Sequence, residues 1–230
     1  MCASVTALLF YTGVLKFNNP SKDKYPIRGV DVSSYQGVID WDVLSSEDID
    51  FAFIKATEGS GFVDPQFSYN FENAIKTDLR IGAYHFFSFE SSGETQADNF
   101  IKNVYPIENM LPPVVDVEFY GKYLSAPPTD VETIKAELRK MIIRLEDNYK
   151  ITPIIYVTEE AYDLFLKNDF KEYPIWIRNV LTKPKISDGR DWTFWQYTNR
   201  ERLRGYKGTE KYIDMNVFYG TADEFNELFN

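Results

Sequence analysis

Two carboxylates in one short apolar segment are the residues of this chain best suited to catalysis. Residues 111–120 read Leu-Pro-Pro-Val-Val-Asp-Val-Glu-Phe-Tyr, which places Asp116 and Glu118 two positions apart among valines. If the segment is a β-strand, both side chains point to the same face, with their Cα atoms about 6.5–7 Å apart. Burying two such carboxylates is costly unless they have partners or chemistry to perform. The spacing is therefore typical of the acid/base pair of a glycosidase.

The strand that carries this pair belongs to an alternating series of strands and helices. Short apolar runs predict eight strands, at residues 29–33, 51–56, 81–87, 113–118, 153–157, 175–177, 193–197 and 212–217. Amphipathic patterns predict helices at residues 66–77, 94–104, 131–149 and 159–166. The last three strands are joined by loops rich in proline, glycine and charge, where we expect no helix. This order predicts one domain of the α/β class, a modified TIM-like barrel of five βα units followed by three strands, (β/α)5(β)3.

Polar and aromatic residues gather at the ends of the predicted strands, where α/β barrels hold their active sites. The candidates for substrate binding are Asp31, Tyr84, Tyr156, Trp176, Gln196, Tyr197 and Asp214. The aromatic members suit the faces of sugar rings, although such side chains serve equally well in a core. We interpret His85 as part of a hydrogen-bond network rather than as a general base, and we expect Lys55 to pair with Glu58.

Charge and composition narrow the class of partner. A net charge of −10 over 230 residues argues against nucleic acid, whose binding requires concentrated Lys and Arg. The chain has a single cysteine, Cys2, which excludes an intrachain disulfide, and a single histidine, so that a Cys/His zinc site cannot be built. We therefore expect a monomeric hydrolase that needs no metal and no other cofactor.

The N-terminal residues form a separate feature. Residues 3–17 are almost entirely apolar, and a polar stretch, 18–25, follows them. About 15 residues are short for a membrane span, which needs about 20, and no basic region or clear cleavage site marks a signal peptide. Three interpretations stay open: a truncated signal-anchor, a poor signal peptide, or a terminal helix packed on the domain. The first two predict export, with residues 1–26 as anchor or signal plus linker and residues 27–230 as the catalytic domain.

Six blocks resemble, in order, the motifs of the glycoside hydrolase family 25 muramidases, the Chalaropsis-type lysozymes. They are Gly29-Val-Asp-Val-Ser-Ser-Tyr-Gln36 with Ile39-Asp-Trp41, Phe53-Ile-Lys-Ala-Thr-Glu-Gly59, Gly82-Ala-Tyr-His-Phe86, Pro113-Val-Val-Asp-Val-Glu118, Trp195-Gln-Tyr197 and Ile213-Asp-Met-Asn216. The resemblance spans residues 27–218, and an ordered series of this kind is far more specific than a lone Asp-x-Glu.

The resemblance implies hydrolysis of the β-1,4 bond between N-acetylmuramic acid and N-acetylglucosamine in bacterial peptidoglycan. It implies Glu118 as general acid/base, Asp116 as its catalytic partner, and Asp31 and Asp214 as flanking carboxylates of an acidic groove. Asp116 has three open roles: attack on the sugar, activation of water, or orientation of the substrate's own 2-acetamido group, which the resemblance favours. The alternatives to a muramidase are a non-catalytic peptidoglycan-binding barrel and a chitinase-type endoglycosidase.

Overall fold

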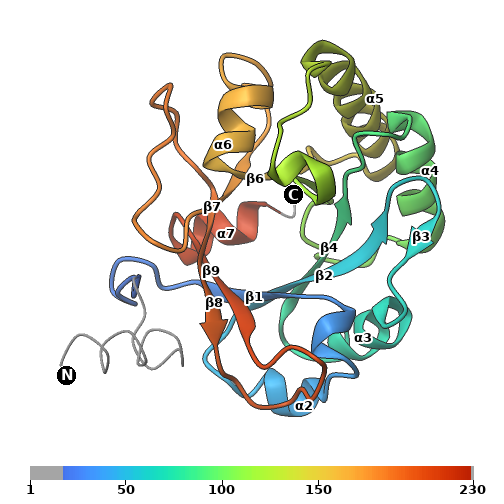
Figure 1. Ribbon diagram of the computed structural model, residues 1–230. Coiled ribbons are helices and arrows are strands. Elements are labelled where there is room, and N and C mark those ends of the chain that lie inside the picture. Colours follow the sequence, from blue (N-terminus) through green and yellow to red (C-terminus); the bar gives the residue numbers. More distant parts are fainter. Residues whose placement is uncertain (1–17, 229–230) are drawn as a thin grey trace, which may run out of the picture.

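The computed structural model describes residues 18–228, and its sheet closes into a barrel (Figure 1). The barrel strands are β1 (Arg28–Val32), β2 (Phe51–Glu58), β4 (Arg80–Phe86), β5 (Val114–Val117), β6 (Ile154–Thr158), β7 (Ile175–Arg178), β8 (Phe194–Glu201) and β9 (Ile213–Phe218). β1 pairs with both β2 and β9, which completes the ring. Neighbouring strands from β1 to β8 are parallel, whereas β9 runs antiparallel to β8 and β1. The predicted barrel is confirmed, with β3 (Phe62–Val63), which pairs with β2, as an addition.

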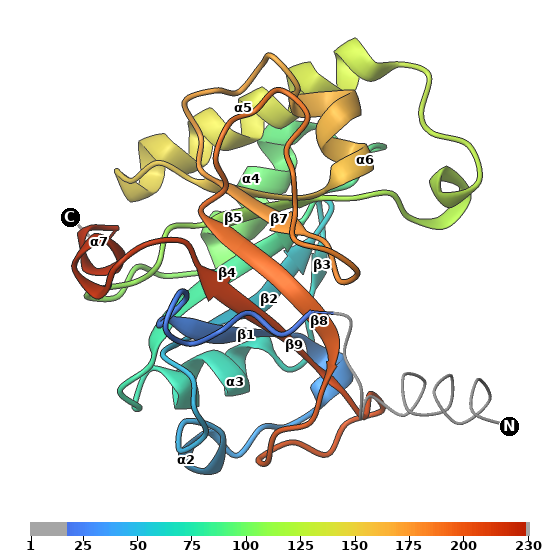
Figure 2. The ribbon, with the colours of Figure 1, turned by 90° about the vertical axis from the view of Figure 1, so that its left-hand side faces the viewer.

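Helices follow the first five barrel strands and lie outside the sheet (Figures 1 and 2). They are α2 (Trp41–Leu44), α3 (Phe67–Ala74), α4 (Gly93–Asn103), α5 (Val131–Tyr149) and α6 (Glu159–Ala161), which continues as a π-helical turn over Tyr162–Leu166. Loops alone connect β7, β8 and β9. The prediction of five βα units followed by three strands is therefore confirmed, whereas the closing helix α7 (Ala222–Glu227) was not predicted.

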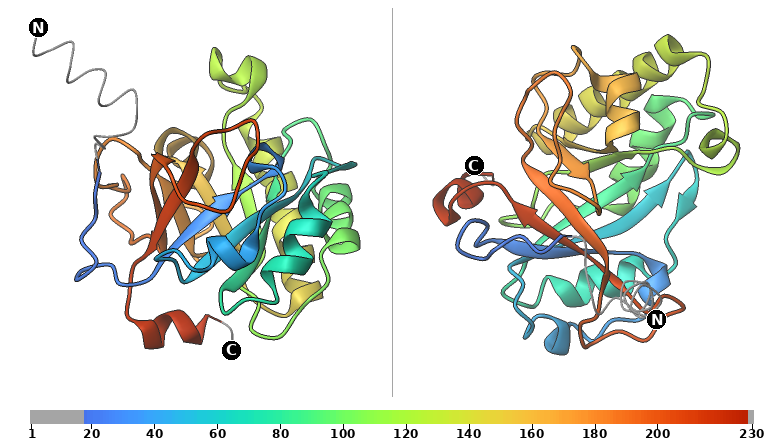
Figure 3. Two further views of the ribbon diagram at one scale, coloured as in Figure 1. Left: turned by 90° about the horizontal axis from the view of Figure 1, so that it is seen from below. Right: turned by 60° about the vertical axis from the view of Figure 1, so that its left-hand side comes forward.

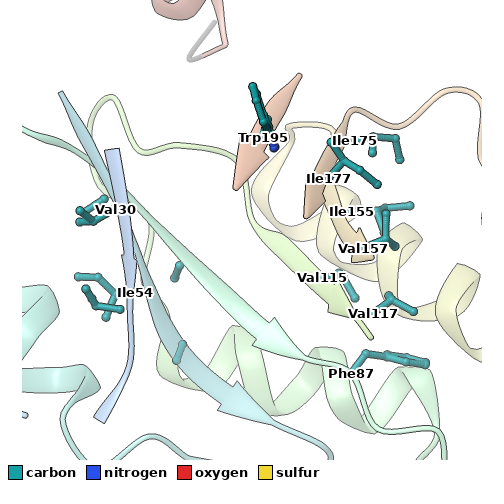
Figure 4. Close-up of a cluster of buried hydrophobic side chains, with 14 of the residues drawn as sticks. Val30, Ile54, Phe87, Val115, Val117, Ile155, Val157, Ile175, Ile177 and Trp195 are labelled. Carbon is teal, nitrogen blue, oxygen red and sulfur yellow. The ribbon is translucent and has the colours of Figure 1, made fainter. Parts of the chain in front are cut away.

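Alternation along the strands separates two cores. The outward side chains, which Figure 4 shows in part, pack against the helices; they include Val30, Ile54, Val115, Val117, Ile155, Val157, Ile175 and Ile177. The inward side chains of the lower barrel are largely aromatic: Phe51, Phe53, Trp176, Phe194 and Phe218. Phe225 of α7 packs on three of these rings, and α7 lies at the foot of the barrel in Figure 3. Apolar side chains thus fill the lower end of the barrel.

Residues 18–26 cover the side of the barrel that has no helix. The Tyr25 ring is buried, with its centroid 6.1 Å from that of Trp195 on the outer face of β8. The Asn18 amide donates a hydrogen bond to the carbonyl of Tyr197 at 3.3 Å. The polar stretch predicted as a linker is therefore packed on the barrel, because the outward aromatic residues of β8 need a cover.

The predicted apolar segment, residues 3–17, lies outside the described residues. Within residues 18–228, the structure contains no helix that is long and apolar enough to cross a membrane.

Candidate active site

A groove of about 970 Å³ opens where the parallel strands end. All the residues predicted to form the site line it, with the exception of Tyr197: they are Asp31, Tyr84, Asp116, Glu118, Tyr156, Trp176, Gln196 and Asp214. Each comes from a strand or directly follows one, so the closed sheet collects side chains that lie far apart in the sequence. Among residues 18–228, this groove brings together the side chains that the predicted chemistry requires.

The antiparallel direction of β9 places Asp214 in the groove. Asp31 lies near the end of β1, whereas Asp214 lies near the start of β9. Because the two strands run in opposite directions, these residues are Cα partners across the sheet. A parallel strand would have carried Asp214 to the other end of the barrel.

A hydrogen-bond network around Gln196 holds the two flanking carboxylates. Oδ2 of Asp31 accepts from Nε2 of Gln196 at 2.9 Å and from Nδ2 of Asn216 at 2.8 Å. The same Nε2 donates to Asp214 at 3.0 Å, and the Tyr156 hydroxyl donates to Oε1 of Gln196 at 3.0 Å. Both ends of the Gln196 amide are thus engaged within the protein, so this residue supports the site from below.

Trp176 completes the floor of the groove. Its indole N–H donates to Oδ1 of Asn216 at 2.9 Å, and its ring lies 4.8 Å from that of Tyr156. Only 1% of Trp176 is exposed, so it orients Asn216 and contributes little open surface to a sugar.

The carboxyl groups of Asp31 and Asp214 lie side by side, because both accept from the same amide nitrogen of Gln196. Burial raises the pKa of Asp214 well above its ordinary value, and the charge of Asp31 raises it further. Burial also raises the pKa of Asp31, but the hydrogen bonds from Asn216 and Gln196 oppose that effect. Burial and charge therefore favour the protonated form more strongly at Asp214 than at Asp31.

Asp116 points inward near the end of β5 and is 7% exposed. Its Oδ1 is buried and has no hydrogen-bond partner among the described residues. Burial raises the pKa of this carboxyl well above its ordinary value, and the charge of Glu118 raises it further. A buried acceptor without a donor is unfavourable by about 1–3 kcal/mol.

Glu118 directly follows β5 and is half-buried in the groove wall. Burial raises its pKa, and so does the charge of Asp31, whereas the cations Arg178 and Lys55 lower it. The neighbouring Lys122 pairs with Glu90 at 3.3 Å and leaves Glu118 free of that partner. Glu118 thus has the environment of a carboxylic acid that keeps its proton to higher pH than usual.

Tyr197 is a correction to the predicted site. It lies on the outer face of β8, opposite to Gln196, where its ring packs on Trp195 under the cover of residues 18–26. Successive strand residues point to opposite faces, so Gln196 and Tyr197 could never both enter the groove.

His85 belongs to a hydrogen-bond network, as predicted; it is fully buried and does not line the groove. Its Nδ1 lies 2.8 Å from the Thr57 hydroxyl, and its Nε2 lies 3.1 Å from Oε1 of Gln96. Since this Oε1 can only accept, Nε2 carries the proton and Nδ1 accepts from Thr57. Burial lowers the pKa of His85 to about 4, so the imidazole is neutral at neutral pH.

Other residues of the groove were not assigned to it from the sequence. Lys55 lines it and donates to Glu58 at 2.8 Å, the pairing that was predicted. Arg178 lines it from the end of β7, a position that already signalled a site residue. The rim residues come from the connections between strands, whose paths the strand pattern does not reveal: Tyr35, Tyr123 and Leu124 lie in short 3-10 helices, and Glu210 and Tyr212 lie just before β9. Within residues 18–228, no group of three or more His, Cys, Asp or Glu side chains is arranged to hold a metal ion.

The model of the Glycosyl hydrolases family 25 matches residues 30–206. The chain belongs to this family. A family 25 glycosyl hydrolase from Bacillus anthracis is similar in structure, with a TM-score of 0.88 and 55% identity over 94% of this chain and 98% of that one. Lysozyme M1 of Streptomyces globisporus is 31% identical over 217 residues, which are 90% of this chain and 73% of the relative. The Escherichia coli protein YegX is 38% identical over 205 residues, 87% of this chain and 72% of that protein.

Membership in family 25 confirms the resemblance that the six sequence blocks indicated. The chain is a glycoside hydrolase of the lysozyme class. The matched region contains residues 30–32 of β1 and all of β2, β4, β5, β6, β7 and β8, whereas β9 lies beyond it.

Proposed function

We propose that this family 25 enzyme is a muramidase. It hydrolyses the β-1,4 bond between N-acetylmuramic acid and N-acetylglucosamine in peptidoglycan, with Glu118 as general acid/base and Asp116 as its partner. The observation that carries the proposal is the contrast between two carboxylates on one strand face. Glu118 lines the open groove with a raised pKa, whereas Asp116 is buried beside it with an acceptor atom that lacks a donor.

Asp116 and Glu118 hold one proton between them, and the bound substrate determines which of the two carries it. Two interacting carboxylates lose their protons in coupled steps, and each charge disfavours the other. When the N–H of the 2-acetamido group donates to the carboxylate of Asp116, it stabilises the ionised form of that residue. The remaining proton then stays on Glu118, which is where protonation of the leaving group requires it.

The reaction proceeds in two steps with retention at the anomeric carbon. Glu118 donates its proton to the glycosidic oxygen, while the acetamido carbonyl oxygen attacks C1 and the bond to the leaving sugar breaks. Asp116 orients the acetamido group and stabilises the positive charge of the resulting oxazolinium ion. Glu118, now ionised, takes a proton from water, and that water opens the oxazolinium ring at C1.

Clearing of purified bacterial walls tests the assignment. We expect Glu118→Gln to lower the rate by about 10²–10⁴-fold, because the amide cannot donate the proton that the leaving oxygen needs. Glu94→Gln, an equally conservative change at an exposed position on α4, is the control and should retain the rate. Equal clearing by wild type and Glu118→Gln would refute the role of Glu118. No clearing by either protein would instead indicate a barrel that only binds peptidoglycan.

Mass spectrometry of the digest identifies the bond that is cleaved. A muramidase leaves N-acetylmuramic acid at the new reducing end, whereas a chitinase-type enzyme leaves N-acetylglucosamine there. For Asp116, a thiazoline analogue of the oxazolinium ion should inhibit the enzyme. A covalent glycosyl adduct on Asp116, trapped and located by peptide mapping, would instead make this residue a nucleophile.

We also propose that the enzyme acts as a monomer outside the cytoplasm, because its substrate lies there and residues 3–17 are apolar. Cell fractionation compares the full chain with a form that lacks residues 1–17. The full chain should reach the membrane or the medium and the shortened form should stay in the cytoplasm. Sedimentation of the purified enzyme tests the monomer.

A further inference from the structure

Arg178 is a cation of the groove, and within residues 18–228 its side chain has no direct partner. It is the last residue of β7 and lies two positions after the inward Trp176, so its side chain starts on the inner face of the barrel. Its Cα neighbours across the sheet are Thr158 of β6 and Gln196 of β8. Among the described residues, its guanidinium forms no hydrogen bond and no ion pair.

The other cations of the groove are engaged. Lys55 donates to Glu58 at 2.8 Å and lies 4.8 Å from the centroid of the Phe86 ring. Arg200 lies over the ring of Tyr212 at 5.8 Å. Among the described cations of the groove, Arg178 is thus the one whose N–H donors are available to a ligand.

Arg178 acts on the carboxylates of the site without touching them. Its charge lowers the pKa of Asp31, of Glu118 and of Asp214. The guanidinium is therefore near enough to influence the groove electrostatically, while its N–H groups stay available. These groups form a planar fork that matches the two oxygens of a carboxylate.

An acidic groove needs such a group if its substrate is itself an acid. The chain has a net charge of −10, and the acidic residues that line the groove include Asp31, Glu160 and Glu210. A muramoyl residue carries a lactyl arm that ends in a carboxylate, or in a peptide with carboxylates of its own. Repulsion by the groove would oppose this arm wherever no cation receives it.

We propose that Arg178 is a specificity-determining residue that binds a carboxylate on the lactyl arm of N-acetylmuramic acid. The inference rests on the proposed muramidase function and adds the group that distinguishes an acidic muramoyl substrate from a neutral one. The carboxylate belongs either to the lactyl acid of a stem-free glycan or to the first acidic residue of the stem peptide. Both sources present the same ligand to the guanidinium.

Two matched pairs of glycans test the proposal by kcat/KM. The first pair is a stem-free muramoyl glycan with the free lactyl acid and its neutral methyl amide. The second pair carries an L-alanyl-D-glutamate stem and its neutral diamide. Wild type should prefer the acid in at least one pair, and that pair identifies the source of the carboxylate.

Arg178→Gln should lower kcat/KM for the preferred acid by about 10- to 100-fold through KM, the cost of one charge-assisted pair. At a pH where Glu118 keeps its proton in both proteins, kcat/KM for the neutral glycan should be nearly unchanged. Arg178→Lys keeps the charge without the planar fork, so it should lower kcat/KM for the acid by less than Arg178→Gln does. Arg204→Gln removes one positive charge outside the groove, from the exposed pair with Glu47, and should alter neither member.

Two results would overturn the proposal. One is the absence of any preference for acid over neutral glycan in the wild type. The other is an equal loss on both members of each pair in Arg178→Gln, together with a move of the alkaline limb of kcat to higher pH. That pattern would mean that Arg178 acts only through the pKa of Glu118. A wild type that cleaves none of the glycans, or leaves N-acetylglucosamine at the reducing end, would instead refute the muramidase function itself.

Discussion

Asp31 and Asp214 face each other across the β1–β9 pair, and one amide nitrogen of Gln196 donates to both, at 2.9 and 3.0 Å. Burial and the charge of Asp31 raise the pKa of Asp214 well above its ordinary value, whereas the hydrogen bonds from Asn216 and Gln196 oppose the rise in the pKa of Asp31. The charge of Asp31 is also one of the causes that raise the pKa of Glu118. The flanking pair therefore does more than shape an acidic groove, because it helps the proposed acid to keep its proton.

Asp31→Asn should move the alkaline limb of the pH profile of kcat to lower pH. Removal of the charge lowers the pKa of Glu118, so the acid loses its proton at a lower pH than in the wild type. On the alkaline side, kcat should fall by about tenfold for each pH unit by which the limb moves. The pH dependence of kcat on a soluble muramoyl glycan measures the shift.

Asp98→Asn provides the control for this prediction, since it also removes one negative charge, from an exposed pair with Arg144 on the helices. Its pH profile should match that of the wild type. An alkaline limb that stays in place or rises in Asp31→Asn would contradict the electrostatic role of Asp31.

Asp116→Asn should stabilise the enzyme at pH 7 while it lowers activity. In the folded state the pKa of Asp116 lies well above its ordinary value of 3.8. Between these two values the folded state holds a proton that the unfolded state has released, so stability falls as pH rises through this window. The raised pKa lowers the free energy of unfolding of the wild type by about 1.4 kcal/mol for each tenfold change in the ionisation constant. The amide of Asp116→Asn does not ionise, so the variant does not bear this cost.

Thermal unfolding at two pH values checks this. The melting temperature of Asp116→Asn should exceed that of the wild type at pH 7, by about 2–4 °C for each kcal/mol in a domain of this size. The gain should shrink at pH 4, where the unfolded state also binds the proton. A variant less stable than the wild type at pH 7 would show that Asp116 is not a strained residue.

His85→Phe should destabilise the fold through loss of the hydrogen bonds to Thr57 and Gln96, by about 1–3 kcal/mol at pH 7.5. The deficit should shrink at lower pH. The pKa of His85 is about 4 in the folded protein and 6.5 ordinarily, so below pH 6.5 the unfolded state binds a proton that the folded state refuses. By pH 5 this lowers the stability of the wild type by about 2 kcal/mol, a loss that the variant does not share.

Urea denaturation at pH 7.5 and pH 5 gives both free energies of unfolding. If His85→Phe loses the same free energy of unfolding at both pH values, or loses more at pH 5, the imidazole is charged in the folded protein at pH 5. The catalytic rate per folded molecule should be retained, because His85 does not line the groove.

Tyr156→Phe and Tyr197→Phe form a matched pair that tests the two faces of the barrel. Tyr156→Phe removes the hydroxyl that orients Gln196, and kcat/KM should fall by about 5- to 10-fold, the value of a typical hydrogen bond. Tyr197→Phe changes the outer face only and should leave kcat/KM as it is. A larger loss in Tyr197→Phe than in Tyr156→Phe would contradict the observed register.

The sequence was sufficient for the order of strands and helices and for most of the groove. Apolar runs and helical periods are local patterns, so they predicted the eight barrel strands. They also predicted the bounds of α5, residues 131–149, as the structure has them. Because parallel strands present their C-terminal ends together, residues at those ends could be grouped before any contact was known. That rule brought Asp31, Asp116 and Glu118 into one site.

Tertiary structure decided the rest, since it depends on contacts between distant segments. Alternation requires Gln196 and Tyr197 to face opposite ways, but only closure of the sheet determines which of them faces inward. Only the antiparallel insertion of β9 puts Asp214 opposite Asp31. The sequence also does not show that residues 18–26 cover β8, or that Arg178 is left without a partner among six acidic groove residues. Residue types and their periods are properties of the chain, whereas burial, charge balance and the pKa values that follow from them arise when the barrel closes.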